Sequence, residues 1–155
     1  ETVPAGTLLQ AMLLHSASDA TLALGEAVDG SEAAFVERMN KAAARLGMGR
    51  TRFRNATGLH EPGHESSARD LAVLARALAR EFPDHAALFK QRELVVKGVT
   101  YYNSNRLLWR DPTVTGLKVG RTAMLVAVLA AILAGLYPAV LATRLEPVDA
   151  LRAGQ

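Results

Sequence analysis

The stretch Gly116-Leu117-Lys118-Val119-Gly120-Arg121-Thr122 divides the chain into two parts of different composition. Up to Gly120, apolar and charged residues alternate as they do in a soluble domain, whereas Ala123 to Ala142 contains no charged residue. Because about 20 apolar residues suffice to cross a bilayer, the sequence predicts a membrane-spanning helix at 123–142 and a short polar tail at 143–155. A buried core helix is the alternative interpretation of the apolar run.

The composition of the 155 residues limits the classes of function. There is room for one domain, here residues 1–122, which begins at Glu1 as if in mid-domain and without a signal peptide. The absence of cysteine excludes disulfides and thiolate zinc sites. The net charge of +3 is modest, and we interpret the one arginine cluster, Arg50 to Arg54, as a solvated edge strand rather than a nucleic-acid patch.

Hydrophobic periodicity predicts that helices come first and strands afterwards, which indicates an α+β fold with an incomplete antiparallel sheet. Ser31 and Ser67 are the expected N-caps, and Gly47 is expected to close a helix in the left-handed conformation. The expected helices are Thr7 to His15, Asp19 to Val28, Glu32 to Leu46, Ser67 to Glu81 and Asp84 to Lys90. The expected strands are Thr51 to Arg54, Glu93 to Val96, Val99 to Tyr102 and Val114 to Val119, with a tight turn at Lys97-Gly98 and a connection at Leu107 to Trp109.

Two short motifs in this domain carry residues suited to acyl transfer. Ser16-Ala17-Ser18 lies in a break between two expected helices, and Lys118-Val119-Gly120 ends an expected strand. A serine enzyme that acts on a peptide's C-terminus needs hydroxyls that relay protons and a cation that holds the free carboxylate. The alternatives are that Ser16 and Ser18 cap helices and that Lys118 is a solvated lysine at a strand end.

The wider sequence resembles the D-alanyl-D-alanine carboxypeptidases, the low-molecular-mass penicillin-binding proteins of the S11 peptidase family. The resemblance covers about residues 3 to 122, with its segments in the family's order and spacing. The segments are Leu8 to Ala27 (LLQAMLLHSASDATLALGEA), Phe35 to Gly47 (FVERMNKAAARLG), Thr51 to Gly63 (TRFRNATGLHEPG), Ser66 to Leu74 (SSARDLAVL), Asn103 to Trp109 (NSNRLLW) and Thr115 to Thr122 (TGLKVGRT).

The resemblance implies the penicillin-binding-protein and β-lactamase-like transpeptidase fold and a set of site residues. This family works with three motifs, S-x-x-K, S-x-N and K-T-G. By resemblance, Ser16 takes the place of the S-x-N serine, which relays protons to and from the nucleophile. Lys118 takes the place of the K-T-G lysine, which binds the substrate carboxylate, and Gly120 matches the third position of that motif.

Three departures from the family pattern put activity in doubt. No Ser in the chain is followed three residues later by Lys, so the nucleophile motif S-x-x-K is absent from these residues. Ser18 stands where S-x-N has Asn, and losing such an orienting group commonly costs about 10²-fold in rate. Val119 stands where K-T-G has Thr, which removes a hydroxyl. Since removing a catalytic serine costs about 10⁶ in turnover, we expect the chain as given to be inactive.

The resemblance also implies partners and a location. The expected substrate is a peptidoglycan stem peptide ending in D-Ala-D-Ala, and β-lactams are expected to bind only if the missing part is supplied. We expect the chain at the periplasmic face of the bacterial inner membrane, held there by 123–142. Residues 123–155 resemble a different family, the last transmembrane helix and cytoplasmic tail of ABC-type export permeases. A non-catalytic membrane-anchored binding module and a permease remnant from a gene fusion are therefore the alternative functions.

The remaining candidate residues receive structural interpretations. His60 and His64 lie four apart in a loop, but no acidic ligand pattern beyond Glu61 and Glu65 supports them, so we expect no metal and no cofactor. We interpret Trp109 as a packing anchor rather than a sugar-stacking platform.

Overall fold

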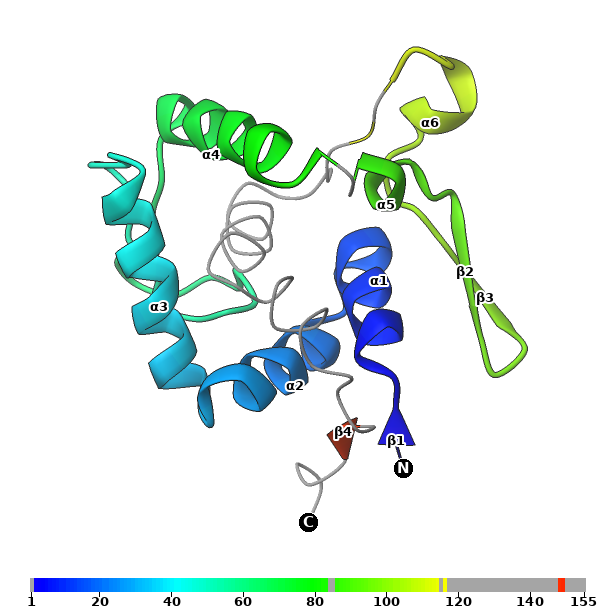
Figure 1. Cartoon of the computed structure of the whole chain (residues 1–155), viewed down its shortest axis with the longest axis horizontal. Coiled ribbons are helices and arrows are strands. Elements are labelled where there is room, and N and C mark those ends of the chain that lie inside the picture. Colours follow the sequence, from blue (N-terminus) through cyan, green and yellow to red (C-terminus); the bar gives the residue numbers. More distant parts are fainter. Residues whose placement is uncertain (1, 84–85, 115, 117–147, 150–155) are drawn as a thin grey trace.

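The computed structural model describes residues 2–83, 86–114, 116 and 148–149 of the chain. Within these ranges the long helices precede the β-hairpin, as predicted for an α+β fold (Figure 1). The helices are α1 (Ala5–His15), α2 (Ser18–Asp29), α3 (Glu32–Arg45), α4 (Ala68–Glu81), α5 (Ala86–Lys90) and α6 (Leu107–Arg110). The strands are β1 (Thr2–Val3), β2 (Glu93–Val96), β3 (Val99–Tyr102) and β4 (Val148–Asp149).

The N-caps of α3 and α4 are the serines predicted from the sequence. Ser31 Oγ accepts a hydrogen bond from the N–H of Ala34 at 3.3 Å, and Ser67 Oγ accepts one from the N–H of Asp70 at 3.2 Å. The Asp70 carboxylate accepts hydrogen bonds from Thr51 Oγ1 at 2.7 Å and from the backbone N–H of residue 50 at 2.9 Å. These bonds hold the pKa of Asp70 below its usual value, Thr51 contributing most, and they tie the loop after α3 to the start of α4.

Helix α1 lies at the centre of the fold, where it contacts α2, α5 and both strands of the hairpin (Figure 1). Its apolar residues join those of α2, α3 and α4 in one core. The largest buried apolar side chains are Met12, Leu14, Leu24, Phe35, Met39, Phe53 and Leu74. Burial of apolar side chains of this size contributes about 1.5–3 kcal/mol each, so the core is what holds the helices together.

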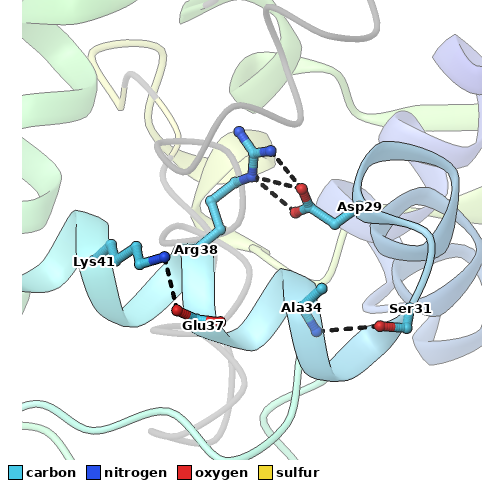
Figure 2. A network of polar contacts seen from close by, with 6 residues as sticks. All are labelled: Asp29, Ser31, Ala34, Glu37, Arg38 and Lys41. Atoms are coloured by element: carbon cyan, nitrogen blue, oxygen red, sulfur yellow. Dashed lines mark hydrogen bonds and ion pairs between the residues drawn. The ribbon is translucent and has the colours of Figure 1, made fainter.

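The contact between α2 and α3 requires a glycine. A Cβ atom added to Gly25 would lie only 2.9 Å from Cδ1 of Phe35, which is completely buried. Polar contacts flank this packing on the surface: Asp29 at the end of α2 accepts hydrogen bonds from Arg38 of α3 (Figure 2). Exposed ion pairs contribute little to stability, so the pair fixes the angle between the helices more than it drives their association.

The predicted hairpin is confirmed in its strands, its register and its turn. β2 and β3 are antiparallel, with Glu93 opposite Tyr102 and Val96 opposite Val99. Lys97 and Gly98 both have positive φ angles, 51° and 77°, as a two-residue type I′ turn demands. Among the described residues each strand pairs only with the other, so each keeps one edge without a strand partner.

Three local predictions need correction or lie outside the described residues. Instead of a strand at Thr51 to Arg54, the structure has a single antiparallel bridge between Arg52 and Glu65, because a loop rather than a second strand lies opposite. The expected connection at Leu107 to Trp109 is a one-turn helix, α6, whose first residue donates its N–H to Asn105 Oδ1 at 3.2 Å. Of the expected strand at 114–119, only residues 114 and 116 are described, and neither is in a strand.

The structure also pairs residues near the two ends of the chain. β1 and β4 are antiparallel, with Thr2 opposite Asp149 and Val3 opposite Val148. This contact was not predicted, since residues 143–155 were expected to be a polar tail. The expected span at 123–142 lies outside the described residues, and none of the helices that are described is both long and apolar enough to cross a membrane.

Candidate active site

The turn between α1 and α2 holds Ser16 in a conformation that is unusual for a serine. Ser16 has φ 60° and ψ 37°, in the left-handed region where glycine is the usual residue. The backbone N–H groups of Ser16 and Ala17 both donate to the carbonyl oxygen of Ala11, the second at 3.4 Å, which closes the end of α1. Strained backbone of this kind is concentrated at functional sites, so it favours a role for Ser16 beyond ending a helix.

The serines of this turn do not cap α2 through their side chains. The N-cap of α2 is Ala17, which has no side-chain acceptor, and Ser18 is the first residue of the helix itself. The start of α2 is instead held by Thr21, which is buried and donates its hydroxyl to the carbonyl oxygen of Ala17 at 2.9 Å. Within the part of the chain that the structure describes, the hydroxyls of Ser16 and Ser18 make no hydrogen bond, and both residues are partly exposed. Both hydroxyls are therefore without a competing partner among the described residues, which favours contact with a ligand.

A segment far along the chain lies against this turn. After β3, the backbone N–H of Ser104 donates to the carbonyl oxygen of Leu14 at 3.1 Å. On the neighbouring turn of α1, the His15 ring meets the Tyr101 ring edge-on, with 5.4 Å between the ring centroids. The end of the hairpin and Ser104 thus contact the last residues of α1, directly before the serine turn.

Two buried asparagines hold that segment in place. Asn103 donates from Nδ2 to the carbonyl oxygen of Gln91 and accepts from the backbone N–H of Asn105, both at 2.9 Å. Asn105 accepts from the N–H of Leu107 at 3.2 Å. Sequence reasoning gave these asparagines no role, although buried polar side chains that pair with backbone groups are the usual way to fix an irregular segment. The two asparagines, spaced two residues apart in NSN, were the sequence signal that could have indicated this structural role.

The strand expected to carry Lys118 is described only at its beginning. Gly116 has φ 89°, and a Cβ atom there would lie 2.4 Å from the carbonyl oxygen of Phe89 in α5, so only glycine fits. This contact brings the chain past α5 two residues before Lys118. Lys118, Val119 and Gly120 lie outside the described residues, so a cleft shared by Ser16 and Lys118 remains a prediction.

His64 is partly buried beside Phe53 rather than arranged as a metal ligand. The two rings meet edge-on at 5.7 Å, and His64 Nε2 is buried without a hydrogen-bond partner. Burial lowers the pKa of His64, which keeps the ring neutral, while the nearby Glu61 carboxylate acts in the opposite direction. Over the described ranges, no three His, Asp or Glu side chains are grouped closely enough to hold a metal ion.

The family model for D-alanyl-D-alanine carboxypeptidases, peptidase S11, matches residues 1–131 of the chain. The chain belongs to this family. The matched region contains the serine turn, the NSN segment and the Lys118 motif, and it extends past residue 122, where we predicted the domain to end. The chain is thus a D-Ala-D-Ala carboxypeptidase-like S11 domain.

Curated S11 relatives and solved structures agree with this assignment. The chain is 37% identical over 124 residues to the D-alanyl-D-alanine carboxypeptidase DacC of Escherichia coli, covering 79% of this chain and 31% of DacC. With DacF of Bacillus subtilis it shares 39% identity over 119 residues, covering 74% of this chain and 31% of DacF. It therefore spans about a third of the length of these relatives.

Solved structures of penicillin-binding proteins show the same fold. Penicillin-binding protein 5 of Haemophilus influenzae superposes with a TM-score of 0.72 at 33% identity, covering 76% of this chain and 34% of that one. Penicillin-binding protein D2 of Listeria monocytogenes, in its cefotaxime-bound form, gives 0.66 at 34% identity, covering 76% and 48%. The predicted penicillin-binding-protein fold is thus confirmed for the helices and partial sheet, whereas nothing supports the likeness of residues 123–155 to export permeases.

Proposed function

We propose that the chain supplies the proton-relay and carboxylate-binding part of a serine-type D-Ala-D-Ala carboxypeptidase site. Family membership over residues 1–131 supports the reaction class. The strained turn at Ser16, with a hydroxyl that has no partner among the described residues, is the structural observation that carries the assignment. The hydroxyl offers one donor and two acceptor lone pairs, which suits a group that passes a proton to and from a neighbouring nucleophile.

The Lys118 motif would bind the C-terminal carboxylate of the peptide, beyond the bond that is cleaved. A lysine ammonium attracts the free carboxylate of a peptide ending in D-Ala-D-Ala, and Gly120 would leave space for the substrate backbone. Ser18 and Val119 replace the family's amide and hydroxyl, so the site orients a substrate with fewer hydrogen bonds. We therefore expect weak binding of the stem peptide together with retained selectivity for a free C-terminus.

Within these 155 residues there is no S-x-x-K motif to supply a nucleophile. The chain by itself is therefore expected to bind its substrate without cleaving it. The decisive experiment incubates the purified chain with a muramyl pentapeptide and with a fluorescent penicillin. We expect no release of D-alanine and no covalent label, whereas release of D-alanine or a labelled band would refute the assignment of an incomplete site.

A non-catalytic binding module in the cell envelope is the second candidate function, and the absence of S-x-x-K from these residues favours it. The relatives are D-alanyl-D-alanine carboxypeptidases by name, which supports a location in the bacterial envelope. Attachment to the periplasmic face of the inner membrane through 123–142, or descent from a permease, would require that segment to cross the bilayer. Flotation of the expressed chain with membranes, and its release by detergent but not by high salt, would support attachment.

A further inference from the structure

A pocket lies where β3 leads into α6. It has a volume of about 370 Å³ and is lined by Tyr102, Asn103, Arg106, Trp109 and Arg110. Ligand pockets for small molecules measure about 300–1,000 Å³, so this one has room for a single sugar or a group of similar size. It goes beyond the proposed function, because none of its residues takes part in acyl transfer.

The two guanidinium groups of the pocket are free to bind an anion. Within the residues that the structure describes, neither Arg106 nor Arg110 makes a side-chain hydrogen bond or an ion pair. The nearest acidic residue in sequence, Asp111, uses its carboxylate to accept from the N–H and the hydroxyl of Thr113 at 2.8 and 2.6 Å. Among the described residues that line the pocket none is acidic, so their net charge is positive.

The pocket also presents two aromatic rings that are only partly buried. Trp109 is 44% exposed and Tyr102 is 60% exposed, so part of each ring can contact a ligand in addition to the packing role expected for Trp109. The Asn103 amide is already occupied on both sides by backbone groups. Recognition in the pocket therefore depends on the guanidinium groups and the ring faces, a combination that suits a flat or ring-shaped ligand carrying a carboxylate or a phosphate.

The helix that carries Trp109 and Arg110 is tied to the residue that precedes β2. Arg92 donates from Nη2 to the carbonyl oxygen of Leu108 at 2.8 Å, which braces α6 against the strand side of the hairpin. Leu108 is buried, so the side chains that flank it in α6 are held at a fixed point. A preformed pocket of this kind binds without a large ordering cost.

We propose that this pocket binds an anionic saccharide, through Arg106 and Arg110 to the anion and through Trp109 to the sugar ring. A nucleic acid is the less suitable ligand, because the net charge is only +3 and the basic residues form no continuous stripe. The anion-plus-ring chemistry rests on the pocket alone. The choice of a cell-wall sugar as the probe rests on the proposed function.

The chain contains a single tryptophan, so its fluorescence and its one indole N–H signal in NMR report on this pocket alone. The full chain is titrated with N-acetylmuramic acid, which joins a carboxylate to the ring, and with N-acetylglucosamine 6-phosphate, which carries a phosphate. N-acetylglucosamine and lactate test the ring and the carboxylate separately. We expect saturable binding of at least one ring-plus-anion ligand, about tenfold or more tighter than either separate part.

The two anionic sugars distinguish the possible sources of the ligand. Binding of N-acetylmuramic acid indicates a muramic-acid carboxylate, and binding of N-acetylglucosamine 6-phosphate indicates a phosphorylated wall polymer. Replacing both arginines, Arg106→Gln and Arg110→Gln, should weaken that binding by about tenfold or more, whereas the exposed Arg69→Gln should leave it unchanged. The proposal would be overturned if neither tryptophan signal changed with any of the sugars, or if N-acetylglucosamine bound as tightly as the anionic sugars. Tighter binding of AMP, which represents a nucleotide ligand, would overturn it as well. Since no readout involves acylation or D-alanine release, its failure is distinct from failure of the proposed function.

Discussion

The backbone N–H of Ser104 donates to the carbonyl oxygen of Leu14 at 3.1 Å, and this bond joins the segment after the hairpin to the end of α1. Leu14 lies two residues before Ser16, whose left-handed backbone begins the break between the helices. The position of the serine turn is therefore set by residues about ninety positions later in the chain. Substitutions in the NSN segment should therefore change the position of the serine turn through this hydrogen bond.

Asn103→Ala tests that connection. The substitution removes hydrogen bonds to Gln91 and Asn105 from a buried position, which should cost about 1–3 kcal/mol of unfolding free energy. Amide hydrogen exchange at Ser104 should become faster in the variant, whereas exchange in α3 should stay unchanged. Equal protection of the Ser104 amide in both proteins would show that the asparagines do not hold the segment.

Ser16 can be tested by changing only its backbone preference. Ser16→Gly should leave stability unchanged or raise it by up to about 1 kcal/mol, because glycine adopts φ 60° without strain. Ser16→Val should lower it by about 1–3 kcal/mol, since a β-branched residue is strongly disfavoured there. Urea denaturation measures both. Similar stabilities for the glycine and valine variants would mean that the turn is not left-handed.

Gly25→Ala should destabilise the contact between α2 and α3. The added methyl group would meet the ring of buried Phe35, at an expected cost of about 1–3 kcal/mol. Gly6→Ala is the matched control, because a Cβ atom there has no neighbour within 4 Å and alanine favours the helix. Thermal or urea unfolding should show loss for the first substitution and a small gain for the second.

His64 gives the chain a predictable pH dependence. Burial lowers the pKa of His64 in the folded state, so the unfolded chain binds a proton more readily. The stability from the neutral ring is complete well above pH 6.5 and is lost as the pH falls through 6.5 towards the folded-state pKa. His64→Phe keeps the edge-on contact with Phe53 without a titrating group. Urea midpoints between pH 7.5 and 5 should fall more in the parent chain than in this variant.

The pairing of β1 with β4 can be tested by cross-linking. Val3 and Val148 lie opposite one another in this pairing. The chain has no cysteine, so Val3→Cys with Val148→Cys should form one disulfide under mild oxidation, visible as faster migration without reductant. Val3→Cys with Thr113→Cys is a control pair. Failure of the first pair to form more readily than the control would count against β1–β4 pairing.

The features that the sequence predicted well are those with local causes. The hairpin follows from alternating strands around Lys97-Gly98, and the caps at Ser31 and Ser67 follow from side chains within a few residues of their partners. Ser67 also shows the limit of such reasoning. The Asp70 carboxylate, three residues after this cap, also binds the loop at Thr51, because a distant N–H and hydroxyl were available.

The features that were missed depend on contacts between distant residues. Nothing near Ser16 in the sequence marks a left-handed residue, since a serine there resembles an ordinary N-cap. The contact of Ser104 with Leu14 and the pairing of β1 with β4 become visible only in three dimensions. Trp109 was interpreted as a packing anchor, and the sequence alone did not indicate that its place on the one-turn helix α6 leaves it 44% exposed.

The central claim is that this chain still binds the free C-terminus of a D-Ala-D-Ala peptide although these residues lack the nucleophile motif. An NMR titration of the isotope-labelled chain with diacetyl-Lys-D-Ala-D-Ala tests it most directly. The account predicts saturable shifts of the Ser16, Ser18, Ser104 and Lys118 amides, and much smaller shifts with the C-terminally amidated peptide. Identical shifts with both peptides, or shifts confined to residues away from the serine turn, would contradict it.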